Sequence, residues 1–121
     1  MKSNKRKICV ISSSRADYSH LYPLIKAIDK SPLLQLELVV TGMHLIKKYG
    51  FTFNEIKKDG FKINAKIDVS QKTSTRKDII KSMSTQMISA HEVLSKISPD
   101  IMVVLGDRYD IHSIVTCANI L

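Results

Sequence analysis

Charged side chains directly follow two apolar segments of this sequence. Asp107 and Arg108 come one residue after residues 101–105, and Arg15 follows residues 8–11 after three serines. A guanidinium binds phosphate oxygens through paired hydrogen bonds, and a carboxylate can take up or release a proton during catalysis. If the two apolar segments are neighbouring strands, these side chains predict a diphosphate site with an acid or a base beside it.

A purely structural role stays open for each of these side chains. Asp107 could cap the helix that follows it, and Arg108 could be an exposed surface charge. Arg15 could pair with Asp17, and Ser19 could do no more than cap a helix. In the functional interpretation, Arg15 and Ser19 instead bind phosphate beside the free amides at a helix N-terminus.

The apolar segments are typical of buried strands in a parallel sheet. Residues 101–105 are apolar without alternation and three of them are β-branched, which predicts a strand buried on both faces. Residues 7–11 and 36–40 predict two further strands. Residues 61–65 alternate between apolar and polar side chains, which predicts an edge strand with one face in water.

Helical patterns separate the predicted strands. A proline is tolerated best in the first turn of a helix, so Pro23 predicts that the first helix begins near Ser19, with Ser19 as its N-cap. Shorter helical pieces are expected at residues 43–48 and 53–58, each followed by a glycine in a C-cap position.

The longest predicted helix has clear signals at both ends. Thr75 and Asp78 match a capping box at its start, and Pro99 should end it. Its apolar stripe includes Ile80, and Ser82 is expected on the opposite, polar side.

A last helix follows Asp110, so strands and helices alternate along the sequence. This order predicts an α/β fold, a Rossmann-like parallel sheet with helices on both faces. In the common strand order 3-2-1-4, residues 7–11 lie beside residues 101–105, and a crevice opens between the carboxyl ends of these strands. We therefore expect the charged side chains that follow the two strands to face each other across one crevice.

The histidine and cysteine residues indicate a function less clearly than the charged residues do. Gly42 allows a close approach at the end of the strand at residues 36–40, and His44 beside it could hold a substrate group or simply pack. Cys9 and Cys117 lie far apart in apolar segments, so we expect buried thiols. No second cysteine is near either of them, and no metal site is predicted.

Length and composition bound the class of protein. The 121 residues, 44% of them hydrophobic and 25% charged, suit a single soluble domain. No apolar stretch is long enough to cross a bilayer, and residues 8–11 are too short for the core of a signal peptide. We therefore expect a cytoplasmic protein with no membrane partner. The loop after residues 8–11 lacks glycine, which disfavours a dinucleotide cofactor.

The formal net charge of +8 allows several explanations. Four positive residues occupy the first seven positions, and many others lie between Lys57 and Lys81 with few aromatic residues among them. A nucleic-acid-binding chain would show aromatic partners for the bases or a recognisable module, so no nucleic-acid partner is predicted. An anionic small molecule, a non-catalytic anion-binding module or solubility alone would explain the charge.

Five short motifs occur in a fixed order along the chain. They occupy residues 14–19, 21–25, 40–45, 59–61 and 99–110, and read SRADYS, LYPLI, VTGMHL, DGF and PDIMVVLGDRYD. Their combination resembles the amino-terminal part of hydrolysing UDP-N-acetylglucosamine 2-epimerases, in the branch that feeds sialic acid synthesis. The resemblance runs in register from about Lys7 to the last residue.

The resemblance implies a glycosyltransferase-B-like enzyme that converts UDP-N-acetylglucosamine and water into N-acetylmannosamine and UDP. In this family UDP is eliminated to leave a 2-acetamidoglucal, and water then adds with inversion at C2. Asp107 matches a catalytic carboxylate, while Arg15, Ser19 and Arg108 match residues that hold UDP. His44 matches by its motif, and its contact with substrate is inferred from its position at the end of a strand. These steps require no nicotinamide and no metal, and the implied partner is a UDP-sugar.

The chain is shorter than members of this family. Residues 1–121 would form a single, incomplete Rossmann-like amino-terminal domain, without the carboxyl-terminal nucleotide-binding domain and further catalytic residues of the family. We therefore expect a fragment without epimerase activity of its own. An uncovered sheet edge beside residues 101–105 would favour a homo-oligomer. A related epimerase for UDP-linked diacetamido sugars, of the legionaminic acid pathway, stays an open alternative.

Overall fold

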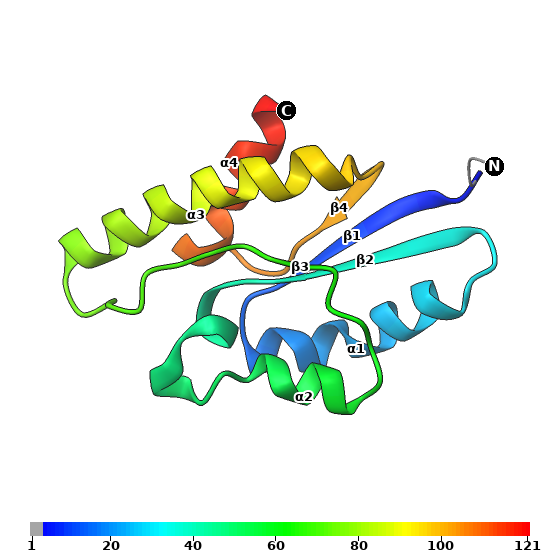
Figure 1. Cartoon of the computed structure of the whole chain (residues 1–121), viewed down its shortest axis with the longest axis horizontal. Helices are drawn as coiled ribbons and strands as arrows, with labels where there is room; N and C mark the ends of the chain where they lie inside the picture. Colours follow the sequence, from blue (N-terminus) through cyan, green and yellow to red (C-terminus); the bar gives the residue numbers. More distant parts are fainter. Residues whose placement is uncertain (1–3) are drawn as a thin grey trace.

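Four parallel strands form one sheet in the order β3-β2-β1-β4 (Figure 1). The computed structural model describes residues 4–121. Its strands are β1 (Arg6–Ser12), β2 (Leu34–Val40), β3 (Ala65–Lys66) and β4 (Ile101–Val103). The α/β class, the parallel sheet and the strand order predicted from the sequence are confirmed.

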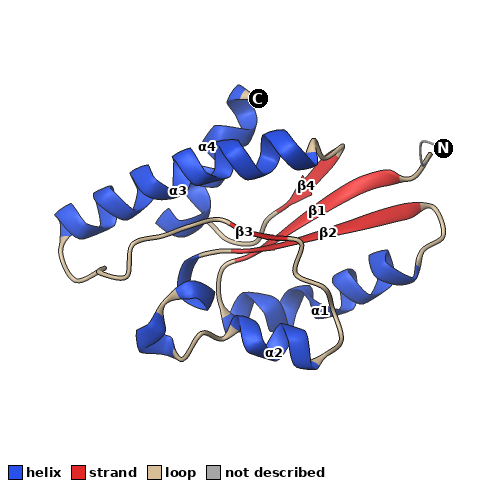
Figure 2. Cartoon of the chain, viewed as in Figure 1, coloured by secondary structure: helices blue, strands red, loops and turns tan. Residues whose placement is uncertain are grey.

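Helices cover both faces of the sheet (Figure 2). They are α1 (Arg15–Lys30), α2 (Phe53–Lys58), α3 (Arg76–Ile97) and α4 (Tyr109–Ile120), and the 3-10 turns η1 (Gly42–Leu45) and η2 (Lys47–Tyr49) lie between β2 and α2. Ile8 and Val10 of β1 pack with residues of α1 and α2, whereas Cys9 and Ile11 pack with residues of α3 and α4. Alternate residues of β1 therefore enter two separate cores, as a central parallel strand requires.

Several local predictions are confirmed. The Thr75 side chain accepts a hydrogen bond from the Asp78 amide, the Asp78 side chain accepts one from the Thr75 amide, and α3 begins at the next residue after this Thr75 cap. Both cysteines are buried, and burial raises the pKa of the Cys9 thiol to about 12. Among residues 4–121, no helix combines the length and the apolar character needed to span a membrane.

The strand β4 differs from its prediction. It is three residues long, and Ile101 is 45% exposed rather than buried on both faces. The reason is its place in the sheet, because β4 pairs with β1 on one side and lies at the sheet edge on the other within residues 4–121. The uncovered edge expected beside residues 101–105 is therefore present in the described part of the chain, whereas burial of the whole apolar run is not.

The N-cap of helix α1 lies five residues earlier than predicted. It is Ser14, whose side chain accepts a hydrogen bond from the Asp17 amide at 3.2 Å, and Ser19 lies in the second turn instead of capping the helix. Pro23 is tolerated inside α1, although an interior proline costs about 3 kcal/mol. Buried residues before and after the proline hold the helix on the sheet: Tyr18, Leu21, Ile25 and Ile28.

The predicted strand at residues 61–65 is reduced to the two residues of β3. Just before β3, the Asn64 side chain accepts a hydrogen bond from the Leu38 amide at 2.9 Å, and the Asn64 amide donates to the Leu38 carbonyl at 2.8 Å. A side chain thus takes the place of a backbone partner, and regular pairing begins only at Ala65.

The buried face of α3 is more polar than predicted. Ile80 is 65% exposed, whereas Ser82 and Gln86 are buried. The Gln86 side-chain amide donates to Thr41 Oγ1 at 2.9 Å and to the Asp110 carbonyl at 2.7 Å, and its oxygen accepts a hydrogen bond from Ser113. One glutamine therefore links α3 to the end of β2 and to α4, and these bonds compensate its burial.

Gly42 lies where three segments meet. It has a φ of +58°, and a Cβ at this position would lie 2.8 Å from the Ser13 carbonyl oxygen and 3.0 Å from Asp110 Oδ2. The close approach that the sequence suggested at Gly42 is therefore present, and it joins the loop after β1 to the start of α4.

We predict that Gly42→Ala destabilises the protein more than Gly60→Ala. Both substitutions place a side chain at a positive φ, but a Cβ at Gly60 would meet nothing within 4 Å. Gly60→Ala should lower the free energy of unfolding by about 1 kcal/mol through backbone strain. Gly42→Ala should lower it by a further 1–3 kcal/mol, roughly, through overlap with the Ser13 carbonyl. Urea denaturation followed by circular dichroism measures both, and equal losses would contradict the prediction.

Candidate active site

The loops that follow β1, β2 and β4 leave the same edge of the parallel sheet, where their strands end (Figure 2). The Thr41 amide donates to the Ser12 carbonyl at 3.0 Å, and the Met43 amide donates to the Ser13 carbonyl at 2.8 Å. These bonds extend the pairing of β1 and β2 beyond the sheet itself. These hydrogen bonds therefore fix the backbone of the loops after β1 and β2 next to each other, at the edge where the predicted site residues lie.

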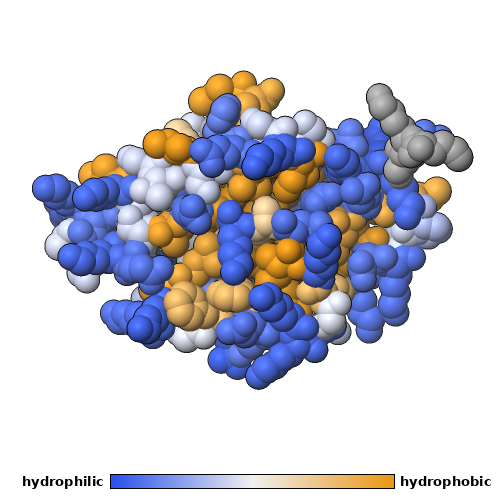
Figure 3. All heavy atoms as spheres, in the orientation of Figure 1, coloured by the Kyte–Doolittle hydropathy of each residue, from blue (hydrophilic) through white to orange (hydrophobic). Residues whose placement is uncertain are grey.

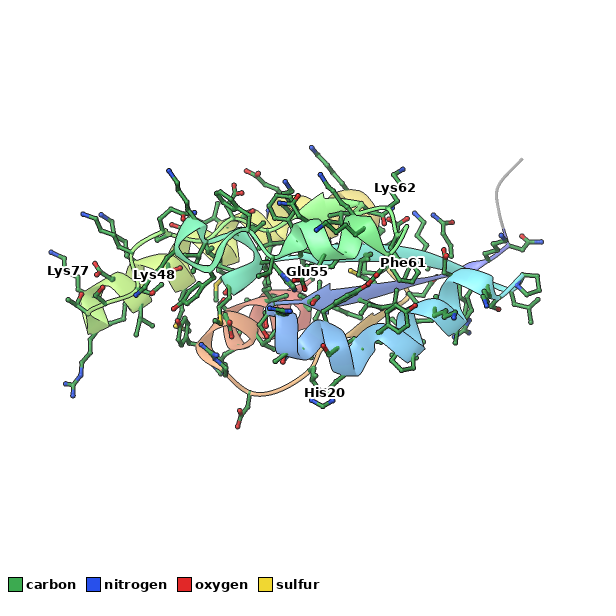
Figure 4. All side chains as sticks on the ribbon, turned by 90° about the horizontal axis from the view of Figure 1, so that it is seen from below. His20, Lys48, Glu55, Phe61, Lys62 and Lys77 are labelled. Carbon is green, nitrogen blue, oxygen red and sulfur yellow. The ribbon has the colours of Figure 1, made fainter. Side chains whose placement is uncertain are left out.

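Arg15 and Ser19 lie on the exposed side of α1. They line an open cleft of about 550 Å³ between α1 and α2, together with Glu55 and other residues of both helices. Arg15 Nε lies 3.1 Å from Glu55 Oε2, and Figure 4 shows Glu55 between α2 and α1. Arg15 therefore pairs with Glu55, not with Asp17, whose carboxylate instead accepts a hydrogen bond from the Ser13 hydroxyl at 2.5 Å.

A second contact also joins the two sides of this cleft. The Tyr18 hydroxyl donates to Asp59 Oδ2 at 2.6 Å, which ties α1 to the residue that follows α2. Burial, together with this carboxylate, raises the pKa of Tyr18. Tyr18 thus stays protonated, and it helps to hold α2 beside the Arg15 side chain.

Asp107 and Arg108 are both exposed in the loop between β4 and α4. Arg108 occupies the N-cap position of α4, and its Nη1 lies 3.7 Å from the sulfur of Met43 in the loop after β2. Its guanidinium also lies 5.6 Å from the centre of the Tyr109 ring. Arg108 therefore reaches across to the neighbouring loop, whereas Asp107 faces water.

His44 is fully buried, and both of its ring nitrogens are used inside the protein. Nε2 lies 2.7 Å from the Ser12 hydroxyl, and Nδ1 lies 2.8 Å from the Thr52 hydroxyl. Burial lowers the pKa of His44 to about 4, against a smaller opposing effect of Asp17, so the imidazole is neutral near pH 7. A direct contact with substrate would require one of these hydrogen bonds to break.

The structure adds Asp110, to which the sequence analysis gave no role. Its side chain is buried, and its Oδ1 accepts no hydrogen bond within residues 4–121 but lies 3.7 Å from Arg108 Nε. Burial raises the pKa of Asp110, and Arg108 opposes that change. Its position in the first turn of α4 was visible in the sequence, but its burial depends on contacts with distant segments.

The predicted site residues follow neighbouring strands, but they do not line one crevice as expected: the cleft of Arg15 and Ser19, between α1 and α2, includes neither Asp107 nor Arg108. Within the described residues, Arg15 pairs with α2, Arg108 pairs with Asp110 and touches Met43, and no ion pair joins the two sides. In residues 4–121, no group of three or more His, Cys, Asp or Glu side chains is arranged to hold a metal ion. The arrangement offers two exposed guanidinium groups and an exposed carboxylate for an anionic ligand.

Comparison of the sequence with known proteins gives consistent relatives. A family model described as UDP-N-acetylglucosamine 2-epimerase matches residues 26–121. The GDP/UDP-N,N'-diacetylbacillosamine 2-epimerase (hydrolyzing) of Campylobacter jejuni is 35% identical over 113 residues, which are 93% of this chain and 29% of that protein. The polysialic acid biosynthesis protein P7 of Escherichia coli is 36% identical over 94% of this chain and 29% of its own length. The chain therefore spans less than a third of the curated relatives it matches.

Solved structures share the fold. UDP-GlcNAc 2-epimerase from Neisseria meningitidis, bound to UDP-GlcNAc, matches with a TM-score of 0.75 and 15% identity over 93% of this chain and 29% of that chain. The enzyme from Methanocaldococcus jannaschii matches with a TM-score of 0.71 and 20% identity over 93% of this chain and 28% of that one. The fold is the Rossmann-like arrangement found in these glycosyltransferase-B-like proteins. With a family model that matches most of its length, the chain belongs to the UDP-N-acetylglucosamine 2-epimerase family.

Proposed function

We propose that residues 1–121 form the amino-terminal part of a hydrolysing UDP-N-acetylglucosamine 2-epimerase, which converts UDP-N-acetylglucosamine and water into N-acetylmannosamine and UDP. The observation that carries the proposal is the placement of Arg15 and Arg108, which follow the neighbouring strands β1 and β4, at one carboxyl edge of the sheet. Open α/β sheets bind ligands at this edge, between neighbouring strands whose helices cover opposite faces. Two guanidinium groups there suit the charge of a diphosphate.

Each exposed residue has a chemical role in the proposal. Arg15, Ser19 and Arg108 hold UDP, and Asp107 takes part in proton transfer beside it. In the first step the proton at C2 is removed and the bond from C1 to the UDP oxygen breaks, which leaves a 2-acetamidoglucal and UDP. In the second step water adds a hydroxyl at C1 and a proton returns to the opposite face of C2. Arginine stabilises the negative charge that develops on the departing diphosphate.

Two alternative functions can be distinguished from this proposal by experiment. The Campylobacter jejuni relative is named as an epimerase of N,N'-diacetylbacillosamine, so a diacetamido sugar is the second candidate substrate. An anion-binding module that uses the basic segment from Lys57 to Lys81 is favoured less, because its charge is not gathered in one place. Figure 4 shows Lys62 and Lys77 far apart along the molecule.

We also propose association of the chain with itself and a cytoplasmic location. The support for association is exposed apolar surface at the end of α4, which Figure 3 shows, and at Ile101 of β4. Ile101 is 45% exposed, Ile120 is 77% exposed and Leu121 is 59% exposed. A second copy of the chain would cover such an edge.

His44 supports the proposed site from inside the protein. Its neutral imidazole joins Ser12, at the end of β1, to Thr52, which precedes α2. α2 carries Glu55, the partner of Arg15. In this role His44 fixes the walls of the cleft without touching the substrate.

We predict that the chain binds UDP and that Arg15→Ala weakens the binding about tenfold, as expected for the loss of a charge-assisted hydrogen bond. Arg76→Ala is the matched control, since it removes another exposed guanidinium, at the start of α3 and within the basic segment. Isothermal titration calorimetry measures the dissociation constants. Equal losses in both variants, or binding of polyanions that UDP does not displace, would support the anion-binding module instead.

The 121-residue chain alone should release no UDP from UDP-GlcNAc above the rate in buffer. Asp107 is exposed to water in this chain, whereas elimination of a charged leaving group is favoured by a site that excludes water. A coupled assay for UDP, with the Neisseria meningitidis enzyme as positive control, tests this expectation. Sustained turnover by the isolated chain would show that these residues suffice.

The buried His44 should make stability depend on pH. Its pKa is about 4 in the folded chain and about 6.5 when unfolded, so its contribution is complete above pH 6.5 and is lost as the pH falls toward 4. Between pH 7 and pH 4.5, His44 should lower the free energy of unfolding by about 2–3 kcal/mol. The measurement compares urea midpoints at both pH values.

In this experiment His44→Gln should abolish that part of the pH dependence. His20→Gln is the matched control, because His20 is exposed on α1 and points away from the body of the protein in Figure 4. It should retain the dependence of the unaltered chain. Equal slopes for all three proteins would mean that His44 is not held neutral by burial.

A further inference from the structure

Asp110 places a carboxylate directly behind the exposed Arg108. The Asp110 residue is 4% exposed, and its Oδ1 has no hydrogen-bond donor within residues 4–121. The nearest cationic atom is Arg108 Nε at 3.7 Å. Burying a charged carboxylate that accepts no hydrogen bond costs free energy. The ion pair with Arg108 is the main interaction that offsets this cost.

The Asp110 side of the pair is enclosed by neighbouring segments. Its backbone carbonyl accepts a hydrogen bond from the Gln86 side chain at 2.7 Å, and Gln86 is also bonded to Thr41 and Ser113. Its Oδ2 lies against the backbone of Gly42, where even a methyl group would be too close. The backbone of Asp110 is therefore bonded to α3, and its carboxylate is packed against the turn after β2.

The Arg108 side of the pair is exposed, and Arg108 has no other anionic partner within 4 Å among the described residues. Its remaining contacts are weak, namely the Met43 sulfur at 3.7 Å and the face of Tyr109 at 5.6 Å. A free arginine side chain samples many rotamers, and a ligand that binds it must overcome that entropy. An anchor at Nε leaves the terminal nitrogens of the guanidinium available for phosphate oxygens.

We propose that Asp110 is a positioning residue, which anchors the Arg108 guanidinium from inside the protein so that it meets the diphosphate in a fixed orientation. This role rests on the proposed function, in which Arg108 binds UDP. It differs from the role of Asp107, which faces water three residues earlier. The charged groups that act on the Asp110 carboxylate are Arg108 and, from α1, Asp17.

The first test is a double-mutant cycle on UDP binding by the 121-residue chain. Arg108→Gln should weaken binding about tenfold and Asp110→Asn about threefold to fivefold, and the double variant should be no weaker than Arg108→Gln alone. Asp29→Asn is the matched control, since it makes the same chemical change on an exposed residue near the end of α1 and should leave binding unchanged. Additive losses would mean that Asp110 does not act through Arg108.

The second test needs no ligand. Titration of the Asp110 carboxyl carbon by nuclear magnetic resonance should show a higher pKa in Arg108→Gln than in the unaltered chain, because the cation that favours the charged form is gone. An unchanged pKa would overturn the inference. If Arg108→Gln leaves UDP binding unaffected, the proposed role of Arg108 itself fails; if it weakens binding while Asp110→Asn does not, only the role of Asp110 fails.

Discussion

The close approach of the Gly42 backbone to Ser13 and Asp110 is the contact on which the site depends. It brings together the loop after β1, the turn after β2 and the first turn of α4. A residue with a Cβ at this position would separate these segments, because backbone and a buried side chain already fill the space. The relative positions of the exposed charges on these loops follow from this contact.

Buried polar groups hold the site, and exposed charged groups are left free to meet a ligand. Gln86 and His44 are enclosed, and each makes hydrogen bonds to more than one segment. Arg15 and Arg108 are exposed on the segments that follow β1 and β4. Such a division is physically reasonable, since buried hydrogen bonds are directional and resist motion, whereas exposed cations keep their affinity for a diphosphate.

The ion pair of Arg15 and Glu55 affects how a ligand would reach the Arg15 guanidinium. The two side chains are 70% and 41% exposed, so the pair contributes at most about 1 kcal/mol. In the proposed function a diphosphate, with more charge and more acceptor oxygens than one carboxylate, would displace Glu55 from Arg15. α2 would keep its place through the Tyr18 to Asp59 hydrogen bond, which does not involve Arg15.

The sequence by itself determined the elements whose signals are local. The capping box at Thr75, the alternation of strands with helices and the motif around Asp107 and Arg108 can all be recognised from neighbouring residues, and they led to the fold, the strand order and the family. Only the tertiary structure decided that β4 is three residues long with Ile101 exposed, that Pro23 lies inside α1 and that Gln86 and Asp110 are buried. The physical reason is that burial, neighbouring strands and hydrogen-bond partners depend on segments far away along the chain, and a local pattern holds no record of them.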